Sequence, residues 1–319
     1  MDLERMLRMC HEGQWKTSDL DWSQAPRPMP RDDEMAIVQL FTDMAGIERL
    51  AGALFVEQHK RTSDPLLKEI FATFVKDEVR HAQAAQMLAD HYDVHHYRAY
   101  RTSLSLERAF PAFVDAIQYL ADDVANAYIT AGELILDVAL LRSVDDYVHD
   151  PMSAQAMALI NRDESRHIAI DYYMVEHYAS DEYKAQRRKV SRSLREEARA
   201  LTAFARLVAR ARPFFRDVFF IPMERVDPSG TRLVEAFKRM QLLGAKPKVA
   251  ELPFMRFMQT VQDLHNSRFA GPRLRSLLAS VAGAEPRFLE QLATDEERAR
   301  ASTMSFDALA EEALAAKRS

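Results

Sequence analysis

The sequence predicts an all-α protein, and three of its features indicate this class. Glycine is scarce, with 8 in 319 residues, whereas a β-protein of this length needs many more for its turns. The residues that favour helices, above all Ala, Leu, Glu, Arg and Met, are abundant. Apolar residues also recur at spacings of three and four, as on one face of a helix. We therefore expect a four-helix bundle with additional C-terminal helices.

Prolines and capping residues mark the expected boundaries of the elements. Residues 1–31 carry three prolines and are expected to form an irregular N-terminal arm, anchored on the body by Trp15 and Trp22. The bundle is expected over residues 32–180. Its four helices are predicted at 32–61, 65–92, 106–147 and 151–178, separated by Thr-Ser-Asp-Pro, a linker rich in His and Tyr, and His-Asp-Pro.

Residues 181–319 are expected to form a helical extension packed on the bundle. Ser180 and Asp181 can cap a fifth helix that reaches about Ala211, and Pro and Gly divide the remainder into shorter pieces. An apolar stripe is expected to be buried along the fifth helix: Val190, Leu194, Leu201, Phe204, Leu207 and Val208. Residues 184–250 carry a net charge of +11, which we expect to balance the acidic bundle; an acidic docking partner is the alternative.

Composition also excludes several classes of protein. The single cysteine, Cys10, rules out an internal disulfide and a cysteine-ligated zinc or iron–sulfur site. The first twenty residues are too charged for a signal peptide, and no apolar run reaches the length of a membrane span. No motif that reads nucleic acid accompanies the basic stretch. We therefore expect a soluble, cytoplasmic protein that binds neither membranes nor nucleic acid.

The same short motif occurs twice within predicted long helices. Residues 76–81 read Lys-Asp-Glu-Val-Arg-His and residues 162–167 read Arg-Asp-Glu-Ser-Arg-His, so both contain Asp-Glu-x-Arg-His. Glu and His three positions apart project from one face of a helix and can reach the same metal ion. One Glu-x-x-His arises easily by chance, but two copies with four identical residues do not. The motif glutamates and histidines are Glu78, His81, Glu164 and His167.

Each motif has a matching glutamate on the helix before it. Glu48 lies 30 residues before Glu78, and Glu133 lies 31 residues before Glu164, as two antiparallel helices with a short connection require. Glu48 shares a helix face with the apolar Phe41, so it points inward. A carboxylate at a core position costs several kcal/mol unless it is paired or bound to metal. The pattern therefore predicts a site for metal ions inside the bundle.

These residues resemble the ligand pattern of the ferritin-like di-iron carboxylate superfamily over about residues 32–178. The Asp-Glu-x-Arg-His form looks most like the hydroxylase subunits of bacterial multicomponent monooxygenases, and acyl-carrier-protein desaturases carry a related form. The resemblance implies a ferritin-like bundle and O2 activation at two Fe ions, with a Mn/Fe pair as the alternative. It implies six ligands: Glu48, Glu78, His81, Glu133, Glu164 and His167.

The resemblance also assigns roles to the other residues of the motifs. Asp77 and Asp163 would not bind metal; each would accept the ring N–H of the histidine from the other motif and so fix its tautomer. Arg80 and Arg166 would offset the charge of the carboxylates.

Further polar residues are expected close to these ligands. Asp171 lies one turn after the second motif and is expected to be a hydrogen-bonded neighbour of the ligands, with an additional ligand or a proton relay as the alternative. Asn126, Thr130 and Asp137 form a polar stripe around Glu133. That stripe either delivers protons or packs against neighbouring helices.

Several positions narrow the choice within the superfamily. The long segment 181–319 would be unnecessary for iron storage. The radical Tyr of ribonucleotide reductase small subunits would stand at Ala85, so a radical-generating role is not expected. Tyr128 matches the cross-linked Tyr of related ligand-binding oxidases, but Ala51 does not match its Val partner, so Tyr128 is expected to be a core aromatic. The p-aminobenzoate N-oxygenases, of similar length, carry a third His where this chain has Ile160.

The sequence therefore predicts a non-haem di-iron oxygenase or oxidase that hydroxylates, desaturates or N-oxygenates a small organic substrate. Electrons would come from an external donor such as a ferredoxin or a reductase, because the chain carries no flavin, nicotinamide or cluster motif. The resemblance implies a homodimer, and an acyl or peptidyl carrier protein is a further candidate partner. Two alternatives stay open: a ferroxidase or metal-handling protein without organic substrate, and a non-catalytic helical scaffold.

Overall fold

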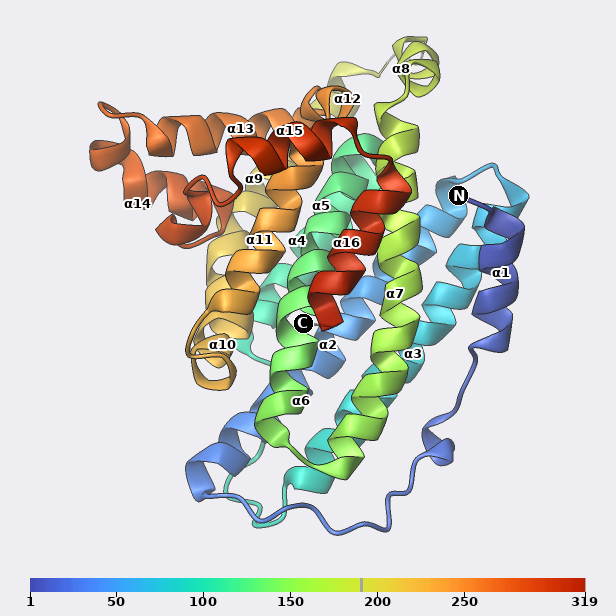
Figure 1. Cartoon of the computed structure of the whole chain (residues 1–319), viewed down its shortest axis with the longest axis vertical. Coiled ribbons are helices and arrows are strands. Elements are labelled where there is room, and N and C mark those ends of the chain that lie inside the picture. Colours follow the sequence, from blue (N-terminus) through green and yellow to red (C-terminus); the bar gives the residue numbers. More distant parts are fainter. Residues whose placement is uncertain (190–191, 319) are drawn as a thin grey trace.

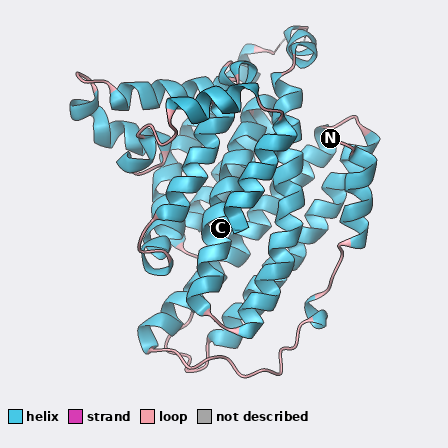
Figure 2. Cartoon of the chain, in the orientation of Figure 1, coloured by secondary structure: helices cyan, strands magenta, loops and turns pink. Residues whose placement is uncertain are grey.

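The computed structural model of the chain describes residues 1–189 and 192–318. Most of these residues are helical, and no strand occurs among them (Figure 1 and Figure 2). The predicted all-α class is therefore confirmed.

Four long helical segments lie side by side at the centre of the molecule and surround the predicted ligands (Figure 1). They are α2 (Arg31–Arg61), α3 (Pro65–Tyr92), α5 (Asp122–Leu134) and α7 (Pro151–Ala179). A π-helical segment, η2 (Ile135–Leu141), and α6 (Arg142–Val148) continue α5 along the same line. Such π-segments often occur at functional sites, and η2 begins two residues after Glu133.

Contacts at the ends of these segments show their directions. At one end, the Tyr92 hydroxyl at the end of α3 donates to the Asp150 carboxylate before α7, at 2.9 Å. The Tyr147 hydroxyl on α6 donates to Asp33 at the start of α2. At the other end, Arg61 of α2 pairs with Asp122 of α5. Helices α2 and α7 therefore run one way, and α3 and the α5–α6 segment run the other.

The capping residues explain the helix boundaries that the sequence predicted correctly. The Asp64 carboxylate accepts from two backbone N–H groups at the start of α3, and Pro65 follows at the first helical position. Asp150 and Pro151 begin α7 in the same manner. His149 ends α6 in a left-handed conformation, with φ 48°.

The prediction of one continuous helix over 106–147 was wrong. The chain forms α4 (Leu104–Tyr119), turns at residues 120–121 and then starts α5. Arg61, at the end of α2, donates hydrogen bonds to the carbonyls of Ile117, Gln118 and Leu120, so it holds the exposed end of α4. Helix α4 is therefore an additional element that connects α3 to α5 along the chain and packs on α2 and α9.

The prediction of a wholly irregular arm over residues 1–31 was also wrong. Residues Leu3–Glu12 form α1, and a short 3-10 turn, η1, follows at Thr17–Asp19. The Asp2 carboxylate caps α1, and Met6 and Cys10 bury its apolar face against α3 and α7. The rest of the segment up to Pro30 follows an extended path along the bundle (Figure 1).

Residues 181–189 and 192–318 form shorter helices that cover one side of the central segments (Figure 1). They are α8 (Asp181–Arg188), α9 (Leu194–Phe215), the π-segment η3 (Arg216–Phe220), α10 (Ile221–Val226), α11 (Thr231–Gly244), α12 (Pro247–Ala250), α13 (Pro253–Asn266), α14 (Gly271–Ala282), the 3-10 turn η4 (Pro286–Leu289), α15 (Asp295–Thr303) and α16 (Phe306–Arg318). Helix α9 packs on α4, α11 packs on η2, and α16 packs on α7.

The predicted fifth helix is divided, and its apolar stripe is only partly buried. Ser193 caps a new helix, α9, after the end of α8. Leu207 is buried with Ala203 and Ala211, but Leu194 and Leu201 are 88% and 70% exposed, because they lie on the opposite face of α9. Val190 lies outside the described residues.

One described segment, Asp122–Val148, is long and apolar enough to cross a membrane by length and composition alone. Of its most apolar window, 83% is buried inside the protein, as in the core helix of a soluble protein.

We predict that Asp150→Ala will lower the free energy of unfolding by about 3 kcal/mol. The substitution removes the cap of α7 and leaves the buried Tyr92 hydroxyl without its acceptor. Asp64→Ala is the matched control, because it removes only the cap of α3 and should cost about 1 kcal/mol. Urea denaturation would measure both values. Equal losses of unfolding free energy in the two variants would show that the Tyr92–Asp150 hydrogen bond between α3 and α7 does not contribute to stability.

Candidate metal centre

The six residues predicted as metal ligands lie together in the interior, on α2, α3, α5 and α7. Each is at most 5% exposed. Their ligand atoms form two groups, and within each group all atoms lie within 4.8 Å of one another. The first group is Glu48, Glu78, His81 and Glu164, and the second is Glu133, Glu164 and His167. These groups could hold metal ions, and Glu164 belongs to both.

Local helix geometry brings the ligands to one level of the bundle. Within each motif the spacing of three places Glu and His on the same inward face of α3 or α7. Helix α2 approaches α3 closely at Gly52, where a Cβ atom would lie 3.2 Å from the Glu78 Cβ. Gly52 therefore allows the backbone of α2 to pass directly beside this ligand.

The two histidines direct their Nδ1 atoms toward the motif glutamates. His81 Nδ1 lies 2.9 Å from Glu164 Oε1. His167 Nδ1 lies 2.8 Å from Glu164 Oε2 and 3.2 Å from Glu78 Oε1. The carboxylates of Glu78 and Glu164 therefore lie between the two rings, where they can bridge two ions.

The opposite ring nitrogens face the motif aspartates in a crossed arrangement. His81 Nε2 is 3.2 Å from Asp163 Oδ2, and His167 Nε2 is 3.6 Å from Asp77 Oδ2. A carboxylate at Nε2 holds the proton on that nitrogen and leaves the Nδ1 lone pair available to a metal. The positions of both aspartates agree with the role that the family resemblance implies.

The motif arginines neutralise these aspartates. Arg166 Nη2 lies 2.8 Å from Asp163 and 3.4 Å from Asp77. Arg80 pairs with Asp77 and lies 3.5 Å from Asp163. Two negative and two positive groups thus form a balanced layer between α3 and α7, outside the ligands.

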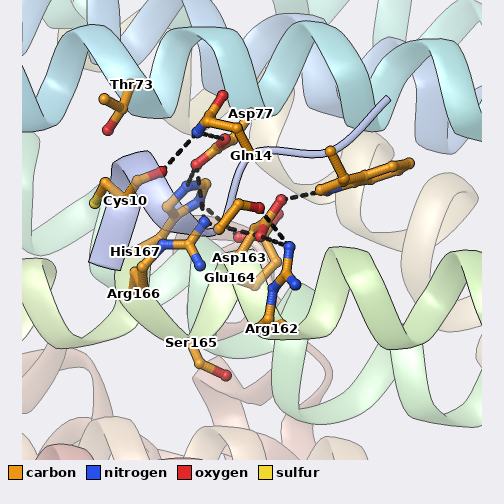
Figure 3. A network of polar contacts seen from close by, with 12 residues as sticks. Cys10, Gln14, Thr73, Asp77, Arg162, Asp163, Glu164, Ser165, Arg166 and His167 are labelled. Carbon is orange, nitrogen blue, oxygen red and sulfur yellow. Dashed lines mark hydrogen bonds and ion pairs between the residues drawn. The ribbon is translucent and has the colours of Figure 1, made fainter. Parts of the chain in front are cut away.

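The N-terminal segment completes this layer, which the sequence reasoning did not foresee in detail. Gln14 Nε2 donates to Asp77 at 3.1 Å (Figure 3). The Arg80 guanidinium donates to the Gln14 amide oxygen. The Trp15 indole N–H donates to Asp163 at 2.7 Å. Sequence reasoning recognised Trp15 only as an anchor, because nothing in its neighbourhood indicates an acidic partner.

The ligands themselves lack such compensation among the described residues. Both oxygens of Glu48 and of Glu78, and one oxygen each of Glu133 and Glu164, are buried without a hydrogen-bond partner. Burial, followed by the charge of Glu164, raises the pKa of Glu48 to about 7. Burial likewise raises the pKa values of Glu78 and Glu133 well above the usual range. Buried, unpaired oxygen donors of this kind fit metal ions, which would supply the missing positive charge.

Aromatic rings exclude water from one side of the cluster. The Phe55 and Phe74 ring centroids lie 5.0 and 4.1 Å from that of His167. Both phenylalanines are fully buried. A low-dielectric wall strengthens the interaction of the carboxylates with any bound cation.

The other predicted polar residues also lie in this interior. Asp171 and Asp137 are fully buried with no hydrogen-bond partner, and burial raises the pKa of Asp171 to about 8. Asp171 belongs to neither group of candidate ligands. The Thr130 hydroxyl donates to the backbone carbonyl of Asn126, whose own side chain has no partner.

Lys317 is a neighbour of this cluster that sequence reasoning missed. It belongs to α16, its side chain is 5% exposed, and its Nζ lies 3.9 Å from Asp137 Oδ2. The same Nζ donates to the backbone carbonyl of Asn161 on α7 at 2.9 Å. The sequence separates Lys317 from Asp137 by most of the C-terminal extension, so no local pattern could indicate the pair.

Comparisons with protein-family models, with curated proteins and with solved structures found no match for this chain. The assignment of a function therefore depends on the geometry of the cluster.

We predict that the metal-free chain loses stability as pH rises from about 5.5 to 9. In the folded state the pKa values of Glu48, Asp171 and His81 are raised to about 7, 8 and 9. Groups with raised pKa values stabilise the fold below their unfolded pKa values, and this contribution disappears as pH rises through the folded values. Groups with lowered values, such as Glu164, are already ionised over this range.

Melting temperatures of the chelator-treated chain at three pH values would test this expectation. Glu48→Gln should make the decline shallower, because an amide does not titrate. Metal-loaded protein should melt at nearly constant temperature over the same range. A melting temperature of the metal-free chain that rises with pH would contradict the prediction.

We predict that Lys317→Met destabilises the fold by about 3 kcal/mol, because it leaves the Asp137 carboxyl buried without the amino group beside it. The double variant Lys317→Met, Asp137→Asn should recover more than half of that loss, since it removes both charges. Urea denaturation of the two single variants and the double variant would measure the coupling. Losses that simply add would show that the two groups do not interact.

Proposed function

We propose that this chain is a non-haem di-iron oxidoreductase that activates O2 and oxidises a small organic substrate. The observation that carries the proposal is the buried arrangement of four glutamates and two histidines at one level of four helices. The directions of those helices, with an additional helix that connects α3 to α5, also suit a ferritin-like bundle.

Charge supports two divalent ions. The aspartate–arginine layer is neutral by itself, and Lys317 lies beside Asp137. The four glutamates and Asp171 remain. The ionised glutamates carry four negative charges, equal to the positive charge of two divalent cations, and Asp171 can stay protonated because burial raises its pKa to about 8. Oxygen-rich sites with two imidazoles suit iron or manganese, whereas zinc prefers more nitrogen and sulfur ligands. Two Fe ions, or a Mn/Fe pair, are therefore the proposed occupants.

When bound, the metal pair would supply the redox chemistry that reduces O2 and transfers oxidising power to the substrate. The chain supplies the surroundings. Asp163 holds a proton on the outer nitrogen of His81, and Asp77 lies 3.6 Å from the outer nitrogen of His167, where its charge favours the same tautomer. Phe55 and Phe74 keep water from one side. The electrons would come from an external donor such as a ferredoxin or a reductase.

Two features favour an oxygenase over iron storage. An apolar cavity of about 60 Å³ reaches Glu133, which suits an organic molecule better than a hydrated cation. A groove of about 750 Å³ lies behind Asp163, between α1, α7 and α16, and three cationic side chains and one acidic side chain line it. Those are Arg162, Arg166, Lys317 and Glu12. Cationic side chains outnumber acidic ones in this lining, so the groove offers Fe²⁺ no acidic entry path.

We predict about two metal ions per chain, with a transient visible absorption band when the Fe(II)-loaded protein meets O2. Metal content by mass spectrometry, followed by stopped-flow absorption after anaerobic loading, would measure both. Glu164→Ala should lose at least one ion per chain, because Glu164 belongs to both ligand groups. Glu176→Ala is the matched control, since Glu176 is exposed on the same helix.

Other outcomes would select the alternative functions. Sustained Fe(II) oxidation that deposits a mineral would indicate a ferroxidase. Wild-type protein that binds no stoichiometric metal, with a Glu164→Ala variant of unchanged fold, would indicate a helical scaffold.

A further inference from the structure

An apolar cavity beside the candidate metal centre offers a place for the substrate. It lies among α2, α4, α5, η2, α9 and η3, with a volume of about 60 Å³. Rings of Phe113, Phe214 and Phe219 form one wall, and Glu133 is the only charged residue that lines it. The cavity therefore meets the cluster at Glu133, on the side that faces the C-terminal extension.

A second cavity continues the first beneath the extension. Its volume is about 40 Å³, and every residue that lines it is uncharged. Tyr128 and Phe215 line both cavities, so these two rings form the partition between them. Met240 and Met258, flexible apolar side chains on α11 and α13, line the outer cavity. The two cavities therefore lie in series from the extension to Glu133, and a movement of the Tyr128 or Phe215 ring would join them into one narrow apolar channel.

The lining determines which molecules can enter. A charged molecule would lose its hydration and find no counter-ion along the channel, which costs several kcal/mol. A ring is also disfavoured, because it must fit within one cavity and each is well below the volume of about 150 Å³ of a dry cavity that holds benzene, whereas a chain can divide its length between the two. An unbranched alkyl chain is thinner and suits two small cavities in series.

One polar group interrupts this apolar lining. The Tyr128 ring packs between Phe113 and Phe254, with centroids 5.4 and 5.5 Å away. Its hydroxyl is buried and has no hydrogen-bond partner among the residues that the structure describes. A buried hydroxyl without a partner is unfavourable, so a ligand group that pairs with it gains both affinity and orientation.

From this arrangement we infer that the substrate is a neutral molecule with an unbranched alkyl chain and one hydroxyl or carbonyl group that pairs with Tyr128. The inference rests on the proposed function, because it takes Glu133 to mark the reacting end of the channel. Binding in the channel, however, does not require metal or O2, so the two can be tested separately.

Titration with 1-hexanol, followed by NMR of methionine methyl groups labelled with carbon-13, would test the inference. The Met240 and Met258 signals should shift saturably, in metal-free and in metal-loaded protein alike. Hexanoate and hexylammonium should bind at least tenfold more weakly, because each carries a charge. Cyclohexanol should also bind more weakly, because its ring exceeds the width of the channel.

Substitutions at two glycines provide a matched pair. A Cβ atom at Gly132, in the inner cavity, or at Gly244, at the end of α11, would meet no other atom within 4 Å. Gly132→Leu should weaken the binding of 1-hexanol at least tenfold by filling the cavity, and Gly244→Leu should leave it unchanged. Gly132→Ala, a smaller change, should give an intermediate loss and tests the same point if the leucine variant folds poorly. Tyr128→Phe should weaken binding about three- to tenfold.

The results that would overturn the inference are equally specific. If 1-hexanol did not shift the Met240 and Met258 methyl signals, the channel would not admit an alkyl chain. Equal binding of hexanoate would contradict the requirement for neutrality, and tighter binding of cyclohexanol would indicate a ring. Unchanged binding in both Gly132 variants would place the ligand elsewhere. If any of these results were obtained with protein that binds two metal ions and reacts with O2, the inferred substrate class would be wrong. The proposed function would still hold.

Discussion

The cost of removing carboxylates from water is the constraint on which the rest of this structure depends. Acidic side chains gather at one level of the interior, and the fold treats them in two ways. Asp77 and Asp163 are paired with arginines and accept hydrogen bonds from the N-terminal segment. The four glutamates lie within reach of one another and of two imidazoles, with several oxygens left unpaired. That second set could hold metal ions.

The layer of paired aspartates and arginines also holds the candidate metal ligands in position. Each aspartate of one motif faces the histidine of the other, and each arginine lies near both aspartates. These crossed contacts fasten α3 to α7 at the height of the ligands. Gln14 and Trp15, from the N-terminal segment, cover this layer and donate hydrogen bonds to its two aspartates. The rings are therefore fixed from behind, while their Nδ1 atoms remain directed inward.

The sequence predicted those features that depend on interactions between residues close together in the chain. The bounds of α3 follow from Asp64 and Pro65, which act on the helix that they begin, so the prediction of 65–92 was correct. The two motifs carry their ligand geometry in a spacing of three residues, and the structure brings all six predicted ligands together.

The break before α5 could not be predicted, because Arg61, from another helix, supplies the hydrogen bonds that hold it. Lys317 has no sequence signal either, since only tertiary packing places its amino group near Asp137. Leu194 shows a different failure: its apolar spacing predicted a buried position, but no other helix covers it.

Lys317 lies near the C-terminal end of the sequence, so during synthesis it reaches Asp137 only after the helices around the cluster have formed. The ribosome releases every helix that carries a predicted ligand before it adds residue 317. Until then the nascent bundle must keep the Asp137 carboxyl protonated or leave it in water, and α16 closes the interior last. A chain that stops before residue 317 would hold all six candidate ligands in a weakened frame. Cellular proteases, which degrade chains that open readily, would therefore remove such products before they collect metal.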